Sequence, residues 1–141
     1  IFQAVIDWHA AGLVPNGEIL IRDTRCQLIQ GDFFEMAVSG FDVENPLRKF
    51  NAILLDIDHS PEHHLDPQNQ SFYTTEGLGS IKGQLKSDGI FALWSNDRAS
   101  DEFTARLRSV FASATAHDIE FPNPYTGANS VNSVYVARVS L

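Results

Sequence analysis

The sequence has a single cysteine and no long apolar run. Cys26 has no second cysteine with which to form an internal disulfide. A free thiol suits a reducing compartment, so we expect the protein in the cytoplasm. No apolar stretch approaches the roughly 20 residues that a membrane-spanning helix needs, and the start of the sequence does not resemble a signal peptide. We therefore expect a soluble protein without a membrane partner.

Basic residues are also scarce. The 141 residues include 10 Lys and Arg against 18 Asp and Glu, which gives a formal charge of -8. Such a chain repels phosphate backbones and anionic lipid surfaces, and no local cluster of basic side chains offsets the repulsion. Nucleic acid is therefore not an expected partner. The length suits one sizeable core, so we expect residues 1–141 to form a single domain.

Apolar spacing and turn residues predict helices alternating with strands. Helices are expected from Ile1 to a C-terminal cap at Gly12, at Phe33–Met36, over Leu78–Leu85 and from Ser100. Strands are expected at residues 26–30, 52–55, 90–94, 115–121 and 133–139, with 40–49 as a surface connection. The uniformly apolar stretch 52–55 is typical of a strand near the centre of a parallel sheet. This order predicts an α/β three-layer sandwich whose mainly parallel sheet ends in an antiparallel hairpin.

Polar side chains follow three of these expected strands. The groups are Asp32, then Asp56 and Asp58, then Ser95 to Asp97. In open α/β sheets, ligands bind beyond the carboxyl ends of the strands. We therefore expect the three segments to meet at one edge and form a site. The alternative is that these carboxylates only cap the turns that follow each strand.

Imidazoles and aromatic rings lie near the second and third of these polar segments. His59, His63 and His64 supply ligand types that suit a metal ion, but their spacing matches no zinc signature, so we expect no metal. Tyr73 and Trp94 are candidates for the wall of a substrate pocket. A place in the hydrophobic core is the alternative for both rings.

Four segments, taken in order, carry a family resemblance. They are CQLIQGDFFE, FNAILLDIDHSP, LKSDGIFALWS and the terminal SVYVARVS. They resemble the third, fourth and fifth strands and the closing hairpin of the class I S-adenosylmethionine-dependent methyltransferase fold, and within it the spermidine synthase-like proteins. The resemblance implies a Rossmann-like methyltransferase fold and an enzyme that moves an aminopropyl or methyl group to a small amine or related nucleophile. S-adenosylmethionine or its decarboxylated form would be the donor substrate.

The resemblance also implies roles for individual residues. Asp32 would accept a hydrogen bond from the adenine amino group, with the Phe33 backbone beside the ring. Asp56 would hold the attacking amine and help to deprotonate it, Asp58 would complete a carboxylate pair, and His59 would contact the substrate. A sulfonium is already an activated leaving group, so such an enzyme mainly orients its nucleophile and keeps it unprotonated.

Two features depart from the family pattern. Asp56 and Asp58 are two positions apart rather than three, and His59 stands where the second acidic residue is expected, which leaves the acceptor open. No Gly-x-Gly-x-Gly motif occurs, and the sequence starts at Ile1 without a polar lead-in or a helix cap. The first strand of the family's fold and its glycine-rich loop would precede Ile1, which predicts an N-terminally truncated domain. Such a domain would be inactive alone and would form a homodimer through exposed strands. A non-catalytic module that self-associates and, less favoured, a metal-dependent hydrolase are the alternatives.

Overall fold

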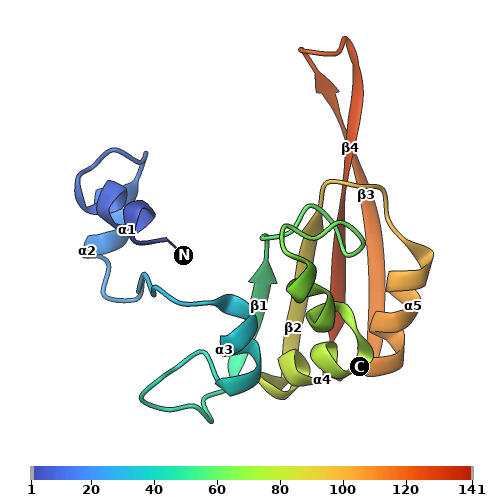
Figure 1. Ribbon diagram of the computed structural model, residues 1–141, viewed down its shortest axis with the longest axis horizontal. Coiled ribbons are helices and arrows are strands. Elements are labelled where there is room, and N and C mark those ends of the chain that lie inside the picture. The colour runs from blue at the N-terminus through green and yellow to red at the C-terminus, as the bar shows by residue number, and fades with distance from the viewer. Residues whose placement is uncertain (1, 141) are drawn as a thin grey trace. The chain divides into compact units, whose positions relative to one another are not determined.

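The computed structural model describes residues 2–140 and divides into two compact units, residues 1–36 and 37–141. We describe each unit by itself. The first contains α1 (Gln3–Ala10) and α2 (Gly17–Arg22), and the boundary falls inside α3 (Phe33–Ser39) (Figure 1). α1 and α3 confirm two expected helices, although Ile1 lies outside the described residues. The expected single domain stays a prediction.

The first unit differs from the sequence prediction in two places. Residues 26–30 form no strand, so that prediction is wrong: no described segment pairs with them, and Cys26 N instead donates to Asp23 O at 2.9 Å in a turn. A strand persists only where a neighbour takes its backbone hydrogen bonds. α2 was not predicted because three consecutive apolar residues at 19–21 show no helical period. It begins after Asn16, which adopts the left-handed φ of 62°.

The second unit is built on a four-stranded sheet in the order β1-β2-β4-β3. The strands are β1 (Phe50–Leu55), β2 (Leu85–Ser95), β3 (Ser113–Asn123) and β4 (Ala128–Arg138). β1 runs parallel to β2, whereas β4 is antiparallel to both β2 and β3. The expected α/β class and its C-terminal antiparallel hairpin are thereby confirmed. Only one of these three pairings is parallel, whereas a mainly parallel sheet was expected. β1 lies at the edge of the four strands rather than near their centre.

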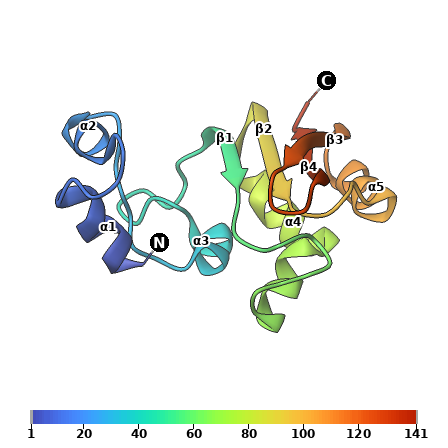
Figure 2. The same ribbon diagram turned by 90° about the horizontal axis from the view of Figure 1, so that it is seen from above.

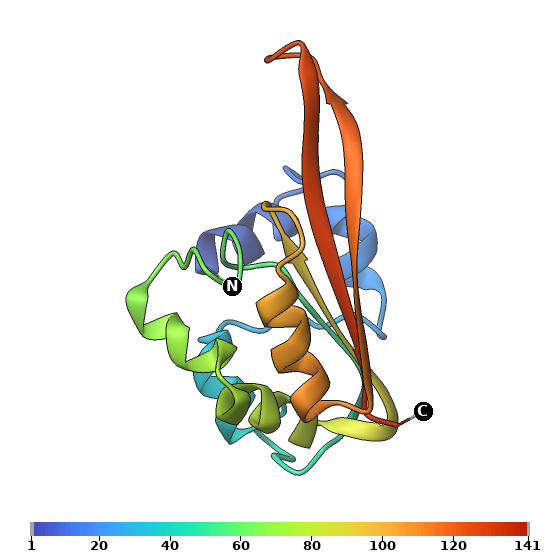
Figure 3. The same ribbon diagram turned by 90° about the vertical axis from the view of Figure 1, so that its right-hand side faces the viewer.

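Helices of the second unit cover one face of this sheet. They are η1 (Pro67–Tyr73), α4 (Thr75–Gly83) and α5 (Asp101–Val110), and α4 and α5 lie on the same side of the strands (Figures 2 and 3). Along β2, Phe91 and Leu93 are buried under these helices, whereas Ala92 and Trp94 on the other face are partly exposed. Within residues 37–140 the helices therefore form one layer, and the second helical layer of the expected sandwich is not seen there.

Local capping explains where these helices begin and end. Ser100 accepts a hydrogen bond from Phe103 N at 3.2 Å at the start of α5, as the sequence predicted. Thr74 caps α4 in the same way through Gly77 N. The expectation that this helix reaches Leu85 is wrong, because Leu85 is already the first residue of β2 and pairs with Phe50 of β1.

The β3–β4 hairpin extends beyond the rest of the sheet. β4 pairs with β2 only from Ser133 to Arg138, whereas it pairs with β3 from Ala128 onward. The distal half is therefore a two-stranded ribbon that projects away from β2 (Figures 1 and 3). None of the helices found within residues 2–140 has the length and apolar character needed to cross a lipid bilayer.

Candidate functional site

The candidate site lies at the carboxyl ends of β1 and β2. These strands are parallel neighbours, with Leu55 opposite Leu93, so the chain leaves both at the same edge. The two following loops, 56–66 and 96–99, are joined where Asn96 N donates to His59 O at 2.7 Å. We call these two loops the rim. Two of the three polar segments that the sequence placed at one edge are therefore brought together there.

Asp56 is the first residue of the rim. Its side chain is exposed, and the structure shows no hydrogen bond or ion pair between its carboxylate and any residue in 2–140. The lone pairs of a carboxylate in this position are open to a ligand, and its ionised form attracts cations such as protonated amines. His59, three residues further on, is also exposed. These positions agree with the roles expected from the sequence, which stay predictions.

Asp58 occupies a very different environment. It is 4% exposed and accepts three sets of hydrogen bonds, from Leu65 N at 2.7 Å, from Asn69 Nδ2 at 2.9 and 3.2 Å and from the Tyr73 hydroxyl at 2.8 Å. A carboxylate enclosed in this way fixes the loop around it rather than meeting a substrate. The catalytic role expected for Asp58 stays a prediction, but its contacts are those of a residue that positions the rim.

Tyr73 and Trp94 do not line a common wall. Tyr73 is buried in the helical layer, where it stacks on His64 with ring centroids 4.8 Å apart and packs edge-on against Phe103. Burial and then the hydrogen bond to Asp58 raise the pKa of Tyr73 well above its ordinary value. Trp94 points to the opposite face of the sheet, because it alternates with the buried Leu93 along β2. The core alternative therefore describes Tyr73 better than a pocket wall does.

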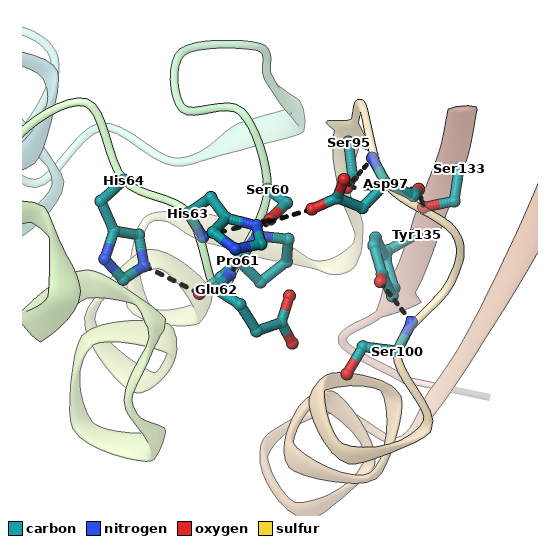
Figure 4. Close-up of polar contacts among 10 residues, drawn as sticks. All are labelled: Ser60, Pro61, Glu62, His63, His64, Ser95, Asp97, Ser100, Ser133 and Tyr135. Atoms are coloured by element: carbon teal, nitrogen blue, oxygen red, sulfur yellow. Dashed lines mark hydrogen bonds and ion pairs between the residues drawn. The ribbon is translucent and has the colours of Figure 1, made fainter. Parts of the chain in front are cut away.

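A polar cluster that the sequence did not assign lies on the rim (Figure 4). His63 Nδ1 lies 2.8 Å from Asp97 Oδ2 and 3.2 Å from Ser60 Oγ, which links the two loops. Hydrogen bonds from Ser60 and from His63 hold the pKa of Asp97 below its ordinary value. The sequence had placed His63 and Asp97 near the site separately. Their contact was missed because they are 34 positions apart.

Asp32 and Phe33, the two residues expected to hold adenine, belong to the first unit. Asp32 is exposed, and its Oδ1 accepts from Phe34 N at 2.8 Å and Glu35 N at 3.3 Å, so it caps α3. Phe33 is half-buried and meets Phe34 edge-on at 5.6 Å. The turn role considered for Asp32 is thus present, and its adenine role stays a prediction.

Metal-ligating side chains are not gathered at the rim. Within residues 2–140, no three or more His, Cys, Asp or Glu side chains lie together in a way that could hold a metal ion. His64, for example, directs its Nε2 to Pro61 O at 2.8 Å. The metal-dependent hydrolase considered from the sequence therefore gains no support.

Comparison with solved structures places this architecture among known folds. A spermidine synthase from Thermotoga maritima matches 99% of the chain with a TM-score of 0.67 and 18% identity. A spermidine synthase in complex with the transition state analogue AdoDATO matches 99% with a TM-score of 0.66 and 18% identity. Human methyltransferase-like protein 13 in complex with SAH matches 88% with a TM-score of 0.58 and 17% identity.

These likenesses define the fold. The chain has the Rossmann-like fold of class I S-adenosylmethionine-dependent methyltransferases, in the form that spermidine synthases also have. It spans 44% and 45% of the length of the two spermidine synthases and 55% of the methyltransferase-like protein. No protein-family model and no curated protein sequence matches the chain.

Proposed function

We propose that this chain acts in a transferase that takes an aminopropyl or methyl group from an S-adenosyl sulfonium donor and passes it to a small amine or related nucleophile. The observation that carries the proposal is the position of Asp56. It is an exposed carboxylate without a protein partner among the described residues, at the carboxyl end of β1. The fold likeness to proteins whose structures were determined with AdoDATO and with SAH supports the choice of donor.

The chemistry assigns Asp56 to the acceptor rather than to the donor. A protonated amine is attracted to the carboxylate, and its loss of a proton exposes the lone pair that attacks the carbon next to sulfur. In this proposal His59 contacts the same acceptor from the rim, and Asp58 holds the loop that carries both residues. Asp32 and Phe33 receive the adenine of the donor. The acceptor is a small molecule of unassigned identity, and no metal takes part.

The proposal also covers location and assembly. Cys26 is a free thiol, so we place the reaction in the reducing environment of the cytoplasm. β1 is the edge strand of the four-stranded sheet, and its Leu54 is 76% exposed, so self-pairing into a homodimer is part of the proposal.

The Asp56→Asn variant, made in the complete transferase in which this chain acts, tests the assignment of Asp56. The amide keeps the shape of the side chain and removes its charge, so the proposal expects kcat with the best amine acceptor to fall at least tenfold. The dissociation constant of S-adenosylmethionine, measured by calorimetry, should stay unchanged. Asp66→Asn is the matched control, because Asp66 is an exposed carboxylate of the same loop whose side chain only caps η1. A loss of kcat within about threefold, which is below 1 kcal/mol, would refute the assignment.

A further inference from the structure

The Ser60, His63 and Asp97 cluster can accept a proton at the same rim. We propose that His63 is a catalytic residue of the transfer reaction, whose Nε2 takes the proton that the incoming nucleophile loses. Asp97 and Ser60 are the positioning residues that fix its ring. This inference rests on the proposed function and adds the group that performs its proton transfer.

The contact with Asp97 determines which ring nitrogen carries hydrogen. His63 Nδ1 lies 2.8 Å from Asp97 Oδ2. An ionised carboxylate only accepts hydrogen bonds, and the low pKa of Asp97 keeps it ionised at neutral pH. Nδ1 must therefore donate, and in the neutral ring the lone pair is left on Nε2. Histidine with its other nitrogen bound to a carboxylate is the arrangement of a general base.

Ser60 fixes the turn on which His63 stands. Its Oγ accepts from His63 N at 3.1 Å and from Glu62 N at 3.4 Å, and the backbones of Ser60 and His63 bond to each other in both directions. Ser60 is 1% exposed, whereas the His63 side chain is 73% exposed. The turn is thus anchored from inside while the imidazole stays open to a ligand.

Asp97 is fastened to the sheet rather than to the loop alone. Its N–H donates to Ser95 Oγ at 3.2 Å, and its carbonyl accepts from Ser133 Oγ at 2.8 Å. Ser95 and Ser133 are completely buried, on β2 and β4 (Figure 4). The carboxylate that orients His63 is therefore held by two central strands. On the loop of His63, His59 contributes to the low pKa of Asp97, and Glu62 is exposed. On the loop of Asp97, Arg98 pairs with Asp118 at 3.0 Å and with Glu120 at 3.4 Å.

The geometry excludes Ser60 as a nucleophile of a hydrolytic triad. In such a triad the serine and the acid contact opposite nitrogens of the histidine. Here Ser60 Oγ and Asp97 Oδ2 both meet Nδ1. Ser60 is also enclosed, so no substrate reaches its hydroxyl. The reactive atom that remains for chemistry is Nε2 of His63.

The step is balanced without any further reactant. The ammonium form of the acceptor gives one proton to Nε2, which produces an imidazolium paired with Asp97. The freed nitrogen lone pair forms a bond to the carbon next to the sulfonium, and the carbon–sulfur bond breaks with its electron pair going to sulfur. The products are the alkylated ammonium and a neutral thioether. The imidazolium then releases its proton to water.

The tautomer of His63 is measured without donor or acceptor. Long-range ¹H–¹⁵N NMR spectra of the labelled protein at neutral pH should show His63 with hydrogen on Nδ1 and an unprotonated Nε2. Asp97→Ala should return His63 to the mixture of a free imidazole, in which Nε2–H is preferred. His117 on β3 is the internal reference that should not change. A wild-type His63 with hydrogen on Nε2 would overturn the inference.

Transfer kinetics provide the second test, with S-adenosylmethionine or its decarboxylated form as donor and a panel of small amines as acceptors. His63→Gln should lower kcat by about 10² to 10⁴ with unchanged donor affinity, and it should remove the acidic limb of the pH–rate profile. Asp97→Asn should lower kcat less and shift that limb. His64→Gln, one residue away, is the control and should stay within threefold. These variants are made in the complete transferase in which this chain acts. Turnover that His63→Gln leaves unchanged overturns this inference alone. A wild-type transferase that neither binds nor uses a donor overturns the proposed function and this inference with it.

Discussion

Replacing Asp58 with alanine should destabilise the second unit strongly, although the residue lies in a loop. The carboxylate is buried and receives hydrogen bonds from Leu65 N, Asn69 Nδ2 and the Tyr73 hydroxyl. Removing it leaves three donors without an acceptor. The variant therefore disconnects the exit of β1 from η1, which carries Asn69 and Tyr73.

The size of the loss follows from how well water replaces the carboxylate at each donor. The Tyr73 hydroxyl is buried, so its unsatisfied donor costs about 1–3 kcal/mol. Leu65 is exposed and Asn69 is partly exposed, so water restores part of their bonds and each loss costs about 0.5–1 kcal/mol. The sum is about 3 kcal/mol. A typical domain has only about 5–15 kcal/mol of stability, so the variant should lose a large share of it.

Urea unfolding followed by tryptophan fluorescence measures this loss. The background is Trp8→Phe, which leaves Trp94 of β2 as the only tryptophan and so reports the second unit. Asp56→Ala is the matched control, because it removes an exposed carboxylate two residues away that has no described partner, and it should cost less than 0.5 kcal/mol. If Asp58→Ala costs under 1 kcal/mol, or no more than the control, the assigned network does not hold the loop.

Two further predictions concern the same region. The folded protein keeps Tyr73 protonated, whereas in the unfolded chain Tyr73 ionises near the ordinary tyrosine pKa of 10.0. The free energy of unfolding should therefore fall as pH rises above 10, by up to about 1.4 kcal/mol per pH unit for each such tyrosine. Tyr73→Phe should reduce this slope in urea titrations at pH 9 to 11. The part of the slope due to the buried Tyr135, whose pKa is also raised, should remain. An unchanged slope would contradict the assignment. Gly77→Ala should destabilise the protein by about 1–3 kcal/mol, because the added Cβ would lie 2.6 Å from the Phe72 Cα. Gly79→Ala in the same helix has open space around the added Cβ and should be neutral or stabilising. Equal urea midpoints for the two variants would refute this reasoning.

The sequence was a reliable guide where local signals determine the element. β2, the closing hairpin and α5 were predicted because apolar alternation, turn residues and the Ser100 cap act within a few positions. The alternation at residues 26–30 was misleading, because it does not reveal whether a neighbouring strand exists. Leu85 fits a helical period and a strand equally well, and its pairing with Phe50 decides the outcome.

The candidate site was predictable only in part for a related reason. Asp56 was placed correctly at a strand end, since a buried strand followed by a carboxylate is a local pattern. Whether Asp58 faces solvent or the interior depends on Tyr73, 15 positions later. The contact between His63 and Asp97 depends on two loops that meet only after β1 and β2 pair. Spacing within one segment carries no information about either contact.

The position of β4 between β2 and β3 constrains the order of events during synthesis. Every antiparallel pairing of the sheet uses β4, the last of the four strands along the chain. A nascent chain that lacks Ala128–Arg138 can form only the β1–β2 pair, which leaves one edge of β2 and the whole of β3 without partners. At about 5–20 residues per second, the 32 positions that separate Ser95 from Ala128 take the ribosome seconds to pass, far longer than a hairpin needs to form. Throughout that interval the growing polypeptide presents unpaired strand edges, which favour aggregation until β4 covers them.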